Sequence, residues 1–239
     1  MIQTNIKPTE IMFLDIETVR GAESLFKMSK DQVLAWKGAV KNNDEGLGEM
    51  QLFTRDAALY PEFGKIVCIS VGYFENADNF KVKAYCNDDE KALLQEITQV
   101  IPKITATRKY FCGHYIKGFD FPYIIRRSVV HGVHLPTSFN IYGLKPWELT
   151  HLIDTMEIWK IGAFGLGCVS LQAICAALGI ENPKEEMSGD MVSTIYYNRS
   201  DPDRLKKIGE YCNSDVVAVA KVFSRFSKTE VNFKVTNIL

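Results

Sequence analysis

Acidic residues near the start of the chain are placed to act together. Asp15 and Glu17 stand two residues apart at the end of the apolar run 11–16, which predicts a buried strand. Side chains alternate between the two faces of a strand, so we expect both carboxylates on one side and Leu14 and Ile16 in the core. Two neighbouring carboxylates repel each other unless a cation lies between them. The alternative interpretation is a strand end with two solvated acids.

Two further acids stand where they could complete the same site. Asp120 lies at a loop-to-helix boundary, where its alternative role is that of a helix N-cap. Tyr211 and Asp215 are four residues apart in the last predicted helix and therefore share one face. The alternative for that pair is a half-buried tyrosine beside a surface aspartate.

Four acids are the number needed to hold two hard divalent cations through oxygen ligands and water. Such a pair supports in-line phosphoryl displacement, because one cation acidifies a water and the other offsets charge on the leaving oxygen. Tyr211 is then placed to orient that water or to take its proton. The residue types therefore predict metal-dependent hydrolysis of a phosphate ester.

The elements that must position these residues follow from hydrophobic periodicity. The expected strands cover residues 11–16, 65–74, 80–86, 109–112 and 152–154, with a hairpin turn at 75–79. The expected helices are a helix-leaning stretch over 23–46 anchored by Trp36, a helix from the capping cluster 87–90 to Pro102, and helices over 118–130, 168–178 and 203–227. Residues 134–149, 162–167 and 181–200 are expected to be connections. This order predicts an α/β fold with a mixed β-sheet flanked by helices, in a single domain over residues 1–239.

Composition limits the possible functions. Apolar residues make up 46% of the 239 residues and charged residues 24%, which is typical of a globular protein. The net charge of −1 argues against binding nucleic acid by charge alone, so such binding would depend on metals, local basic groups and stacking. No apolar run is long enough to cross a bilayer and no signal segment precedes the first strand. The six cysteines form no C-x-x-C pair, which predicts reduced thiols and a cytoplasmic location.

The three motifs, in this order, resemble those of the DEDD exonuclease superfamily, tyrosine type, and in particular the proofreading exonuclease domain of family-B DNA polymerases. The resemblance covers about residues 11–226 and includes PEFGKIVCISVG at 61–72 and SLQAICAALGI at 170–180. It implies a ribonuclease-H-like fold and a 3′→5′ exonuclease that uses two divalent cations, Mg²⁺ or Mn²⁺. The implied substrate is the 3′ end of mainly single-stranded DNA. Because the chain ends soon after this region, the resemblance implies a free-standing nuclease of a bacterial polymerase-B-like type.

The resemblance also assigns individual residues. The implied metal ligands are Asp15, Glu17, Asp120 and Asp215, and the implied catalytic tyrosine is Tyr211. The residues implied to line the channel for the 3′-terminal nucleotide are Ile16, Thr18, Tyr115 and Phe119. The histidine-type branch would carry His where this chain has Glu210. Relatives usually carry Asn at the position of Tyr115, which can instead donate a hydrogen bond or stack on a base, so we expect end-binding to differ.

Two other functions are compatible with parts of the sequence. The first is a nucleic-acid-binding module that retains the fold without turnover. The second is a phosphatase with Asp15 as the nucleophile, which would require a second Asp where this chain has Glu17.

The remaining polar and aromatic residues receive structural interpretations. His131 and His134 form an H-x-x-H pair with no third ligand nearby, so we do not expect a zinc site. Trp147 and Trp159 are expected to be packing anchors, and Asp154 a structural acid. Three basic residues lie near Asp120 in the sequence: Lys117, Arg126 and Arg127. They are expected either to contact phosphates or to form a solvated helix face.

Overall fold

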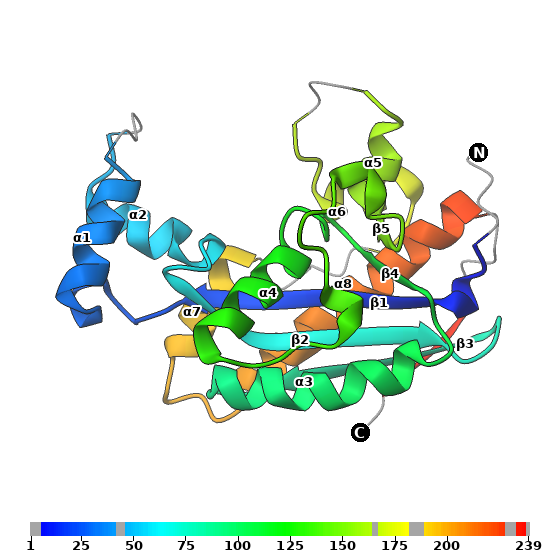
Figure 1. Ribbon diagram of the computed structural model, residues 1–239, viewed down its shortest axis with the longest axis horizontal. Helices are drawn as coiled ribbons and strands as arrows, with labels where there is room; N and C mark the ends of the chain where they lie inside the picture. The colour runs from blue at the N-terminus through cyan, green and yellow to red at the C-terminus, as the bar shows by residue number, and fades with distance from the viewer. Residues whose placement is uncertain (1–5, 42–45, 164–166, 182–188, 228–232, 238–239) are drawn as a thin grey trace.

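A six-stranded mixed sheet forms the centre of the fold, with strand order β5-β4-β1-β2-β3-β6 (Figure 1). The computed structural model describes residues 6–41, 46–163, 167–181, 189–227 and 233–237. β1 (Ile11–Arg20) pairs antiparallel with β2 (Gly64–Phe74), which pairs antiparallel with β3 (Asn79–Cys86). The parallel pairs are β1 with β4 (Tyr110–Gly113), β4 with β5 (Leu152–Asp154) and β3 with β6 (Lys234–Asn237). This arrangement confirms the predicted α/β fold.

Helices cover both faces of the sheet. Their bounds are α1 Lys30–Ala39, α2 Glu49–Asp56, α3 Glu90–Thr105, α4 Asp120–His131, α5 Thr155–Lys160, α6 Leu171–Leu178, α7 Gly189–Tyr197 and α8 Arg204–Ser227. Short 3-10 turns lie at Pro8–Glu10 (η1), Leu25–Lys27 (η2), Ala57–Leu59 (η3), Thr137–Phe139 (η4) and Pro146–Glu148 (η5). Figure 1 shows α3 and α4 in front of the central strands and α8 behind them.

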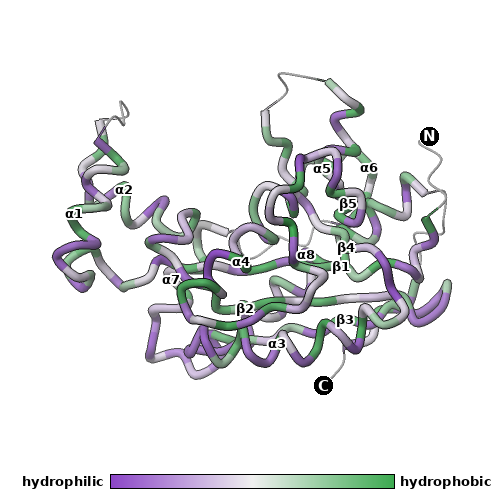
Figure 2. The backbone as a smooth tube through the Cα atoms, viewed as in Figure 1, coloured by the Kyte–Doolittle hydropathy of each residue, from purple (hydrophilic) through white to green (hydrophobic). Residues whose placement is uncertain are grey.

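Side-chain alternation along β1 divides the core into two layers. Met12, Leu14 and Ile16 pack on the side of α3 and α4, whereas Ile11 and Phe13 pack on the side of α6 and α8. Figure 2 shows the apolar residues concentrated along the central strands. Since Asp15 and Glu17 continue the series of Ile11 and Phe13, their carboxylates face α8.

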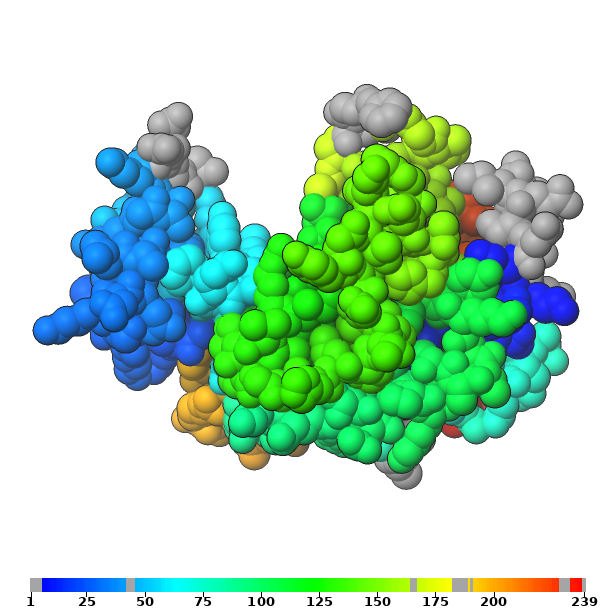
Figure 3. Space-filling view, viewed as in Figure 1, coloured from blue at the N-terminus to red at the C-terminus, as the bar shows by residue number. Residues whose placement is uncertain are grey.

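A separate small core holds the segment between β1 and β2. Trp36 is fully buried there, and its ring meets Phe53 and Phe63 edge-on at centroid distances of 5.4 and 5.0 Å. This confirms Trp36 as the anchor of the region. Figure 3 shows a hollow between this α1–α2 part (blue to cyan) and the part that runs from α4 to α6 (green to yellow).

Several boundaries and elements differ from the sequence-based expectations. β1 continues four residues past Ile16, because pairing with β2 extends to Arg20 opposite Gly64. α3 continues past Pro102 to Thr105, since a proline near the end of a helix removes only one internal hydrogen bond.

The expected connection 181–200 contains α7, and the expected single helical stretch 23–46 is η2 followed by α1. α2, α5 and β6 were not expected. Parts of the expected segments 23–46, 162–167 and 181–200 lie outside the described residues, namely 42–45, 164–166 and 182–188.

Candidate active site

β1 presents two acids to α8. One ligand atom each from Asp15, Glu17 and Cys212 lies within 4.8 Å of the others. Glu17 is 8% exposed, so the interpretation of two solvated acids at a strand end is wrong for this residue. A carboxylate buried at this position requires a compensating charge or proton.

Asp120 reaches β1 from the start of α4. It is the first residue of the helix, and the N-cap position belongs to Phe119. Its Oδ1 accepts a hydrogen bond from the backbone N–H of Ile16 at 3.1 Å, and the side chain is 3% exposed. The alternative role as an N-cap is therefore wrong, because the carboxylate is bonded to the strand that carries Asp15 and Glu17.

α8 supplies the tyrosine and the fourth acid. Tyr211 and Asp215 lie one turn apart and are each 6% exposed, which excludes the alternative of a surface aspartate. Sequence reasoning missed the neighbouring Cys212, whose thiol donates to Asp15 Oδ2 at 3.3 Å. Its position next to Tyr211 in the third motif was the available signal.

Electrostatic interactions link these residues across three elements. Burial raises the pKa of Asp15 well above its usual range, and the charges of Asp120, Asp215 and Glu17 raise it further. Burial is also the main cause that raises the pKa of Asp120 to about 7, with Asp215 among the contributing charges. The four carboxylates therefore cannot all be ionised at neutral pH without added positive charge.

Tyr211 lies within the influence of the same charges. Burial raises the pKa of its phenol far above its ordinary value, and Asp215, Glu17 and Asp15 act in the same direction. The hydroxyl is therefore protonated at neutral pH, which makes it a hydrogen-bonding group rather than a bulk base.

The donor chemistry of the cluster fits hard divalent cations. Four carboxylates provide the oxygen ligands that Mg²⁺ and Mn²⁺ prefer. The thiols of Cys212 and Cys68 are fully buried, and burial raises the pKa of each well above its usual range. The thiol of Cys212, which lies beside Asp15 and Glu17, is a softer donor than the carboxylates.

Asp154 fixes the loop that leads to Asp120. Its carboxylate accepts hydrogen bonds from the backbone N–H groups of Tyr115 at 3.0 Å, Lys117 at 3.3 Å and Met156 at 3.0 Å. Tyr115 has a left-handed backbone with φ of +63°, which is uncommon for a residue other than glycine. Asp154 thus has the structural role expected from the sequence.

The four expected channel residues differ in accessibility. The side chain of Ile16 is buried in the core beside α4, and the hydroxyl of Thr18 donates to Ala58 O at 2.8 Å. Phe119 is half-buried, with its ring 5.2 Å from that of Tyr123. Tyr115 is 42% exposed and is the most accessible of the four.

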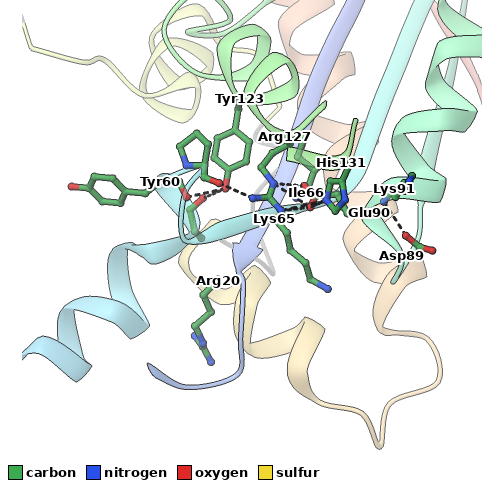
Figure 4. A network of polar contacts seen from close by, with 12 residues as sticks. Arg20, Tyr60, Lys65, Ile66, Asp89, Glu90, Lys91, Tyr123, Arg127 and His131 are labelled. Carbon is green, nitrogen blue, oxygen red and sulfur yellow. Dashed lines mark hydrogen bonds and ion pairs between the residues drawn. The ribbon is translucent and has the colours of Figure 1, made fainter. Parts of the chain in front are cut away.

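His131 belongs to a polar cluster around Glu90. Figure 4 shows it beside Glu90 and Arg127, where its Nε2 lies 2.7 Å from Glu90 Oε2. Arg127 forms an ion pair of 2.6 Å with the same oxygen and also donates to Pro61 O. Glu90 in turn accepts from the backbone N–H of Ile66, so the cluster joins α3, α4 and β2.

The two tryptophans and the basic residues near Asp120 differ in their surroundings. Trp159 packs against Phe226 at a centroid distance of 6.3 Å, as expected for an anchor. Trp147 is 72% exposed, so its assignment as a packing anchor is wrong. Lys117 forms an ion pair of 2.7 Å with Glu157. Arg127 is buried in the Glu90 cluster, so neither a phosphate contact nor a solvated face describes it.

Comparisons with known proteins agree with this fold. A family model of the RNase H superfamily matches residues 56–227. The family B DNA polymerase from the hyperthermophilic archaeon Pyrobaculum calidifontis is similar in structure, with a TM-score of 0.54 and 14% sequence identity. That match covers 92% of this chain and 24% of the polymerase chain, and at this identity it shows likeness of fold alone. No curated protein matches the sequence. Among the described residues, no helix is long and apolar enough to span a membrane.

Proposed function

The chain belongs to the RNase H superfamily, and on this premise we propose that it is a metal-dependent 3′→5′ exonuclease acting on single-stranded DNA ends. The observation that carries the proposal is the convergence of Asp15, Glu17, Asp120 and Asp215 from β1, α4 and α8. Burial and the charges of the other three acids raise the pKa of Asp15, and bound cations would offset this accumulation of charge. Mg²⁺ and Mn²⁺ are the proposed cations.

In the proposed mechanism, the four carboxylates would hold two divalent cations. When bound, these cations supply Lewis acidity that activates a water and offsets charge on the leaving 3′-oxygen. Asp120 aligns the site, because its hydrogen bond to Ile16 N–H fixes α4 against β1. The protonated hydroxyl of Tyr211 orients the attacking water, which is consistent with the raised pKa of this phenol.

The preference for single-stranded DNA is proposed from the fold and from the shape of the molecular surface. A family B DNA polymerase is similar in structure, which favours DNA over RNA as the substrate. The hydroxyl of Thr18 on β1 donates to Ala58 O of η3, and the hollow in Figure 3 is the proposed entry for the DNA end. A frayed single strand enters such a hollow more readily than a duplex, which must first unstack. The exposed ring of Tyr115 is the proposed stacking surface for the terminal base.

The test is digestion of a 5′-labelled single-stranded oligonucleotide with Mg²⁺ or Mn²⁺. A descending ladder of products supports 3′→5′ action, and EDTA should abolish it. Immediate release of a labelled mononucleotide shows the opposite polarity, and a single internal product shows an endonuclease. Matched duplex DNA and RNA substrates measure the preference for single-stranded DNA.

Two variants show whether the described residues perform the reaction. Asp215→Asn should lower turnover by several orders of magnitude, because residues that act as one unit lose function together. Asp78→Asn is the matched control, since Asp78 is exposed at the turn between β2 and β3. Oligonucleotide binding without cleavage by the parent protein, in either metal, would support the non-catalytic binding module instead.

A further inference from the structure

Two thiols face each other on the neighbouring strands β2 and β3, next to the acidic cluster. Cys68 on β2 pairs directly with Cys86 on β3, and Glu17 on β1 pairs with Cys68. The three residues form one row, and Cys68 and Cys86 pack against α7 and α8. The two sulfur atoms are 3.0 Å apart.

The backbone at this position suits a cross-strand disulfide. The N–H of Asn87 donates to Val67 O at 3.1 Å, one residue outward on both strands. The Cys68–Cys86 pair is therefore a non-hydrogen-bonded pair, in which Cα atoms lie about 4.5 Å apart and side chains approach each other closely. This separation lies within the range of about 4.4–6.8 Å found in disulfides. Bond formation requires the sulfurs to approach by about 1 Å.

The two thiols differ in access to solvent. Cys86 is partly exposed at the end of β3, whereas Cys68 is fully buried. An accessible thiol beside a buried one is the arrangement of an oxidisable cysteine with its resolving partner. We propose that Cys86 and Cys68 form a thiol-oxidation site that closes to an intrachain disulfide when the folded protein meets a hydroperoxide.

The chemistry balances in two steps. The peroxide O–O bond breaks as Cys86 sulfur takes one oxygen, which yields a sulfenic acid and releases water from hydrogen peroxide. Cys68 sulfur then attacks the sulfenic sulfur, so an S–S bond forms and the S–O bond breaks. The hydroxide leaves with the proton of Cys68 as a second water. The two thiols are oxidised by two electrons, and the peroxide is reduced.

The test treats the folded protein with hydrogen peroxide, blocks remaining thiols and maps peptides by mass spectrometry without reduction. A Cys168→Ser background removes the exposed thiol, which could otherwise link two chains. The expected product has lost two hydrogen atoms, contains a linked Cys68–Cys86 peptide and returns to the parent mass with dithiothreitol. This readout does not depend on nuclease activity.

Three variants in the same background serve as comparisons. Cys86→Ser and Cys68→Ala should each abolish the disulfide, and Cys68→Ala should leave Cys86 as a sulfenic acid. Cys175→Ser is the control, because Cys175 lies on α6 and is buried in another part of the core, with residues of α8. A Cys68–Cys212 link, a sulfinic acid at Cys86 with no disulfide, or oxidation only after unfolding would each overturn the proposal.

Discussion

The substitution Asp120→Asn tests the electrostatic account of the site in the metal-free protein. The amide keeps the shape of the carboxyl group, and its carbonyl oxygen can still accept the hydrogen bond from Ile16 N–H. It cannot carry a negative charge. The variant therefore removes the repulsion among the acids while it retains the contact between α4 and β1.

The expected magnitude follows from the pKa of Asp120. Its ordinary value is 3.8, and in the folded protein the pKa is about 7. The folded state therefore holds the proton more tightly, and the free energy of unfolding falls as the pH rises from about 4 to about 7. The difference of about three pKa units corresponds to about 4 kcal/mol at about pH 8, and about 1.5 kcal/mol at about pH 5. Asn does not titrate, so the free energy of unfolding of Asp120→Asn does not fall in this way. Relative to that of the parent, it should rise by about 2.5 kcal/mol from about pH 5 to about pH 8.

Thermal unfolding in EDTA at both pH values measures the effect. For a chain of this length, the melting temperature of Asp120→Asn relative to the parent should rise by about 5–10 °C from about pH 5 to about pH 8. Asp78→Asn, at an exposed turn, should show no such change. Adding Mn²⁺ should reverse the order, because a cation that binds the folded parent stabilises it by mass action. An equal difference at both pH values would refute the raised pKa of Asp120, which burial and the neighbouring acids together cause.

Three further predictions address separate parts of the molecule. Tyr211→Phe should slow single-turnover cleavage by about 10²–10⁴-fold with unchanged Mn²⁺ affinity, measured against Tyr142→Phe, since Tyr142 is 97% exposed; parental turnover would place water positioning elsewhere. Tyr115→Ala should weaken oligonucleotide binding by about 1–3 kcal/mol in a titration with Ca²⁺, whereas Tyr115→Asn should be tolerated better; equal affinities would mean that the ring does not meet the nucleotide. Glu90→Ala should lower the free energy of unfolding, measured in urea, by about 3–5 kcal/mol, because it removes the carboxylate that pairs with the buried Arg127. A loss below about 1 kcal/mol would show that this cluster does not stabilise the contact of α3 with α4.

The left-handed backbone of Tyr115 adds to the second of these predictions. Asn adopts positive φ more readily than Tyr, because its short side chain can bond to the local backbone. The ring of Tyr115 also lies against Gly118, where an added Cβ would come within 2.2 Å of it. The sequence indicated only that this residue departs from the usual Asn, whereas the structure shows that a backbone suited to Asn carries a larger ring.

Elements with strong local patterns could be predicted from the sequence. The hairpin of β2 and β3, the strand β5 and the helix α8 have hydrophobic periods or turn residues of their own. The shared faces of Asp15 with Glu17 and of Tyr211 with Asp215 follow from the same local geometry. β6 could not be predicted in this way, because its four residues are exposed and it forms by pairing with the edge of β3. α7 was hidden in a polar stretch, although its Val192 and Tyr196 are fully buried in the core.

The residues that could do chemistry were recognisable from the sequence, because residue type and short-range spacing decide which acids share a face. Tertiary structure alone decided how those faces meet. The bond from Ile16 N–H to Asp120 joins residues 104 positions apart, and the contact of Cys212 with Asp15 spans 197. No local period encodes such separations, which depend on the parallel pairing of β1 with β4 and on the packing of α8 across the sheet. Burial of the acids is likewise a tertiary property, and it raises the pKa of Asp15 and Asp120.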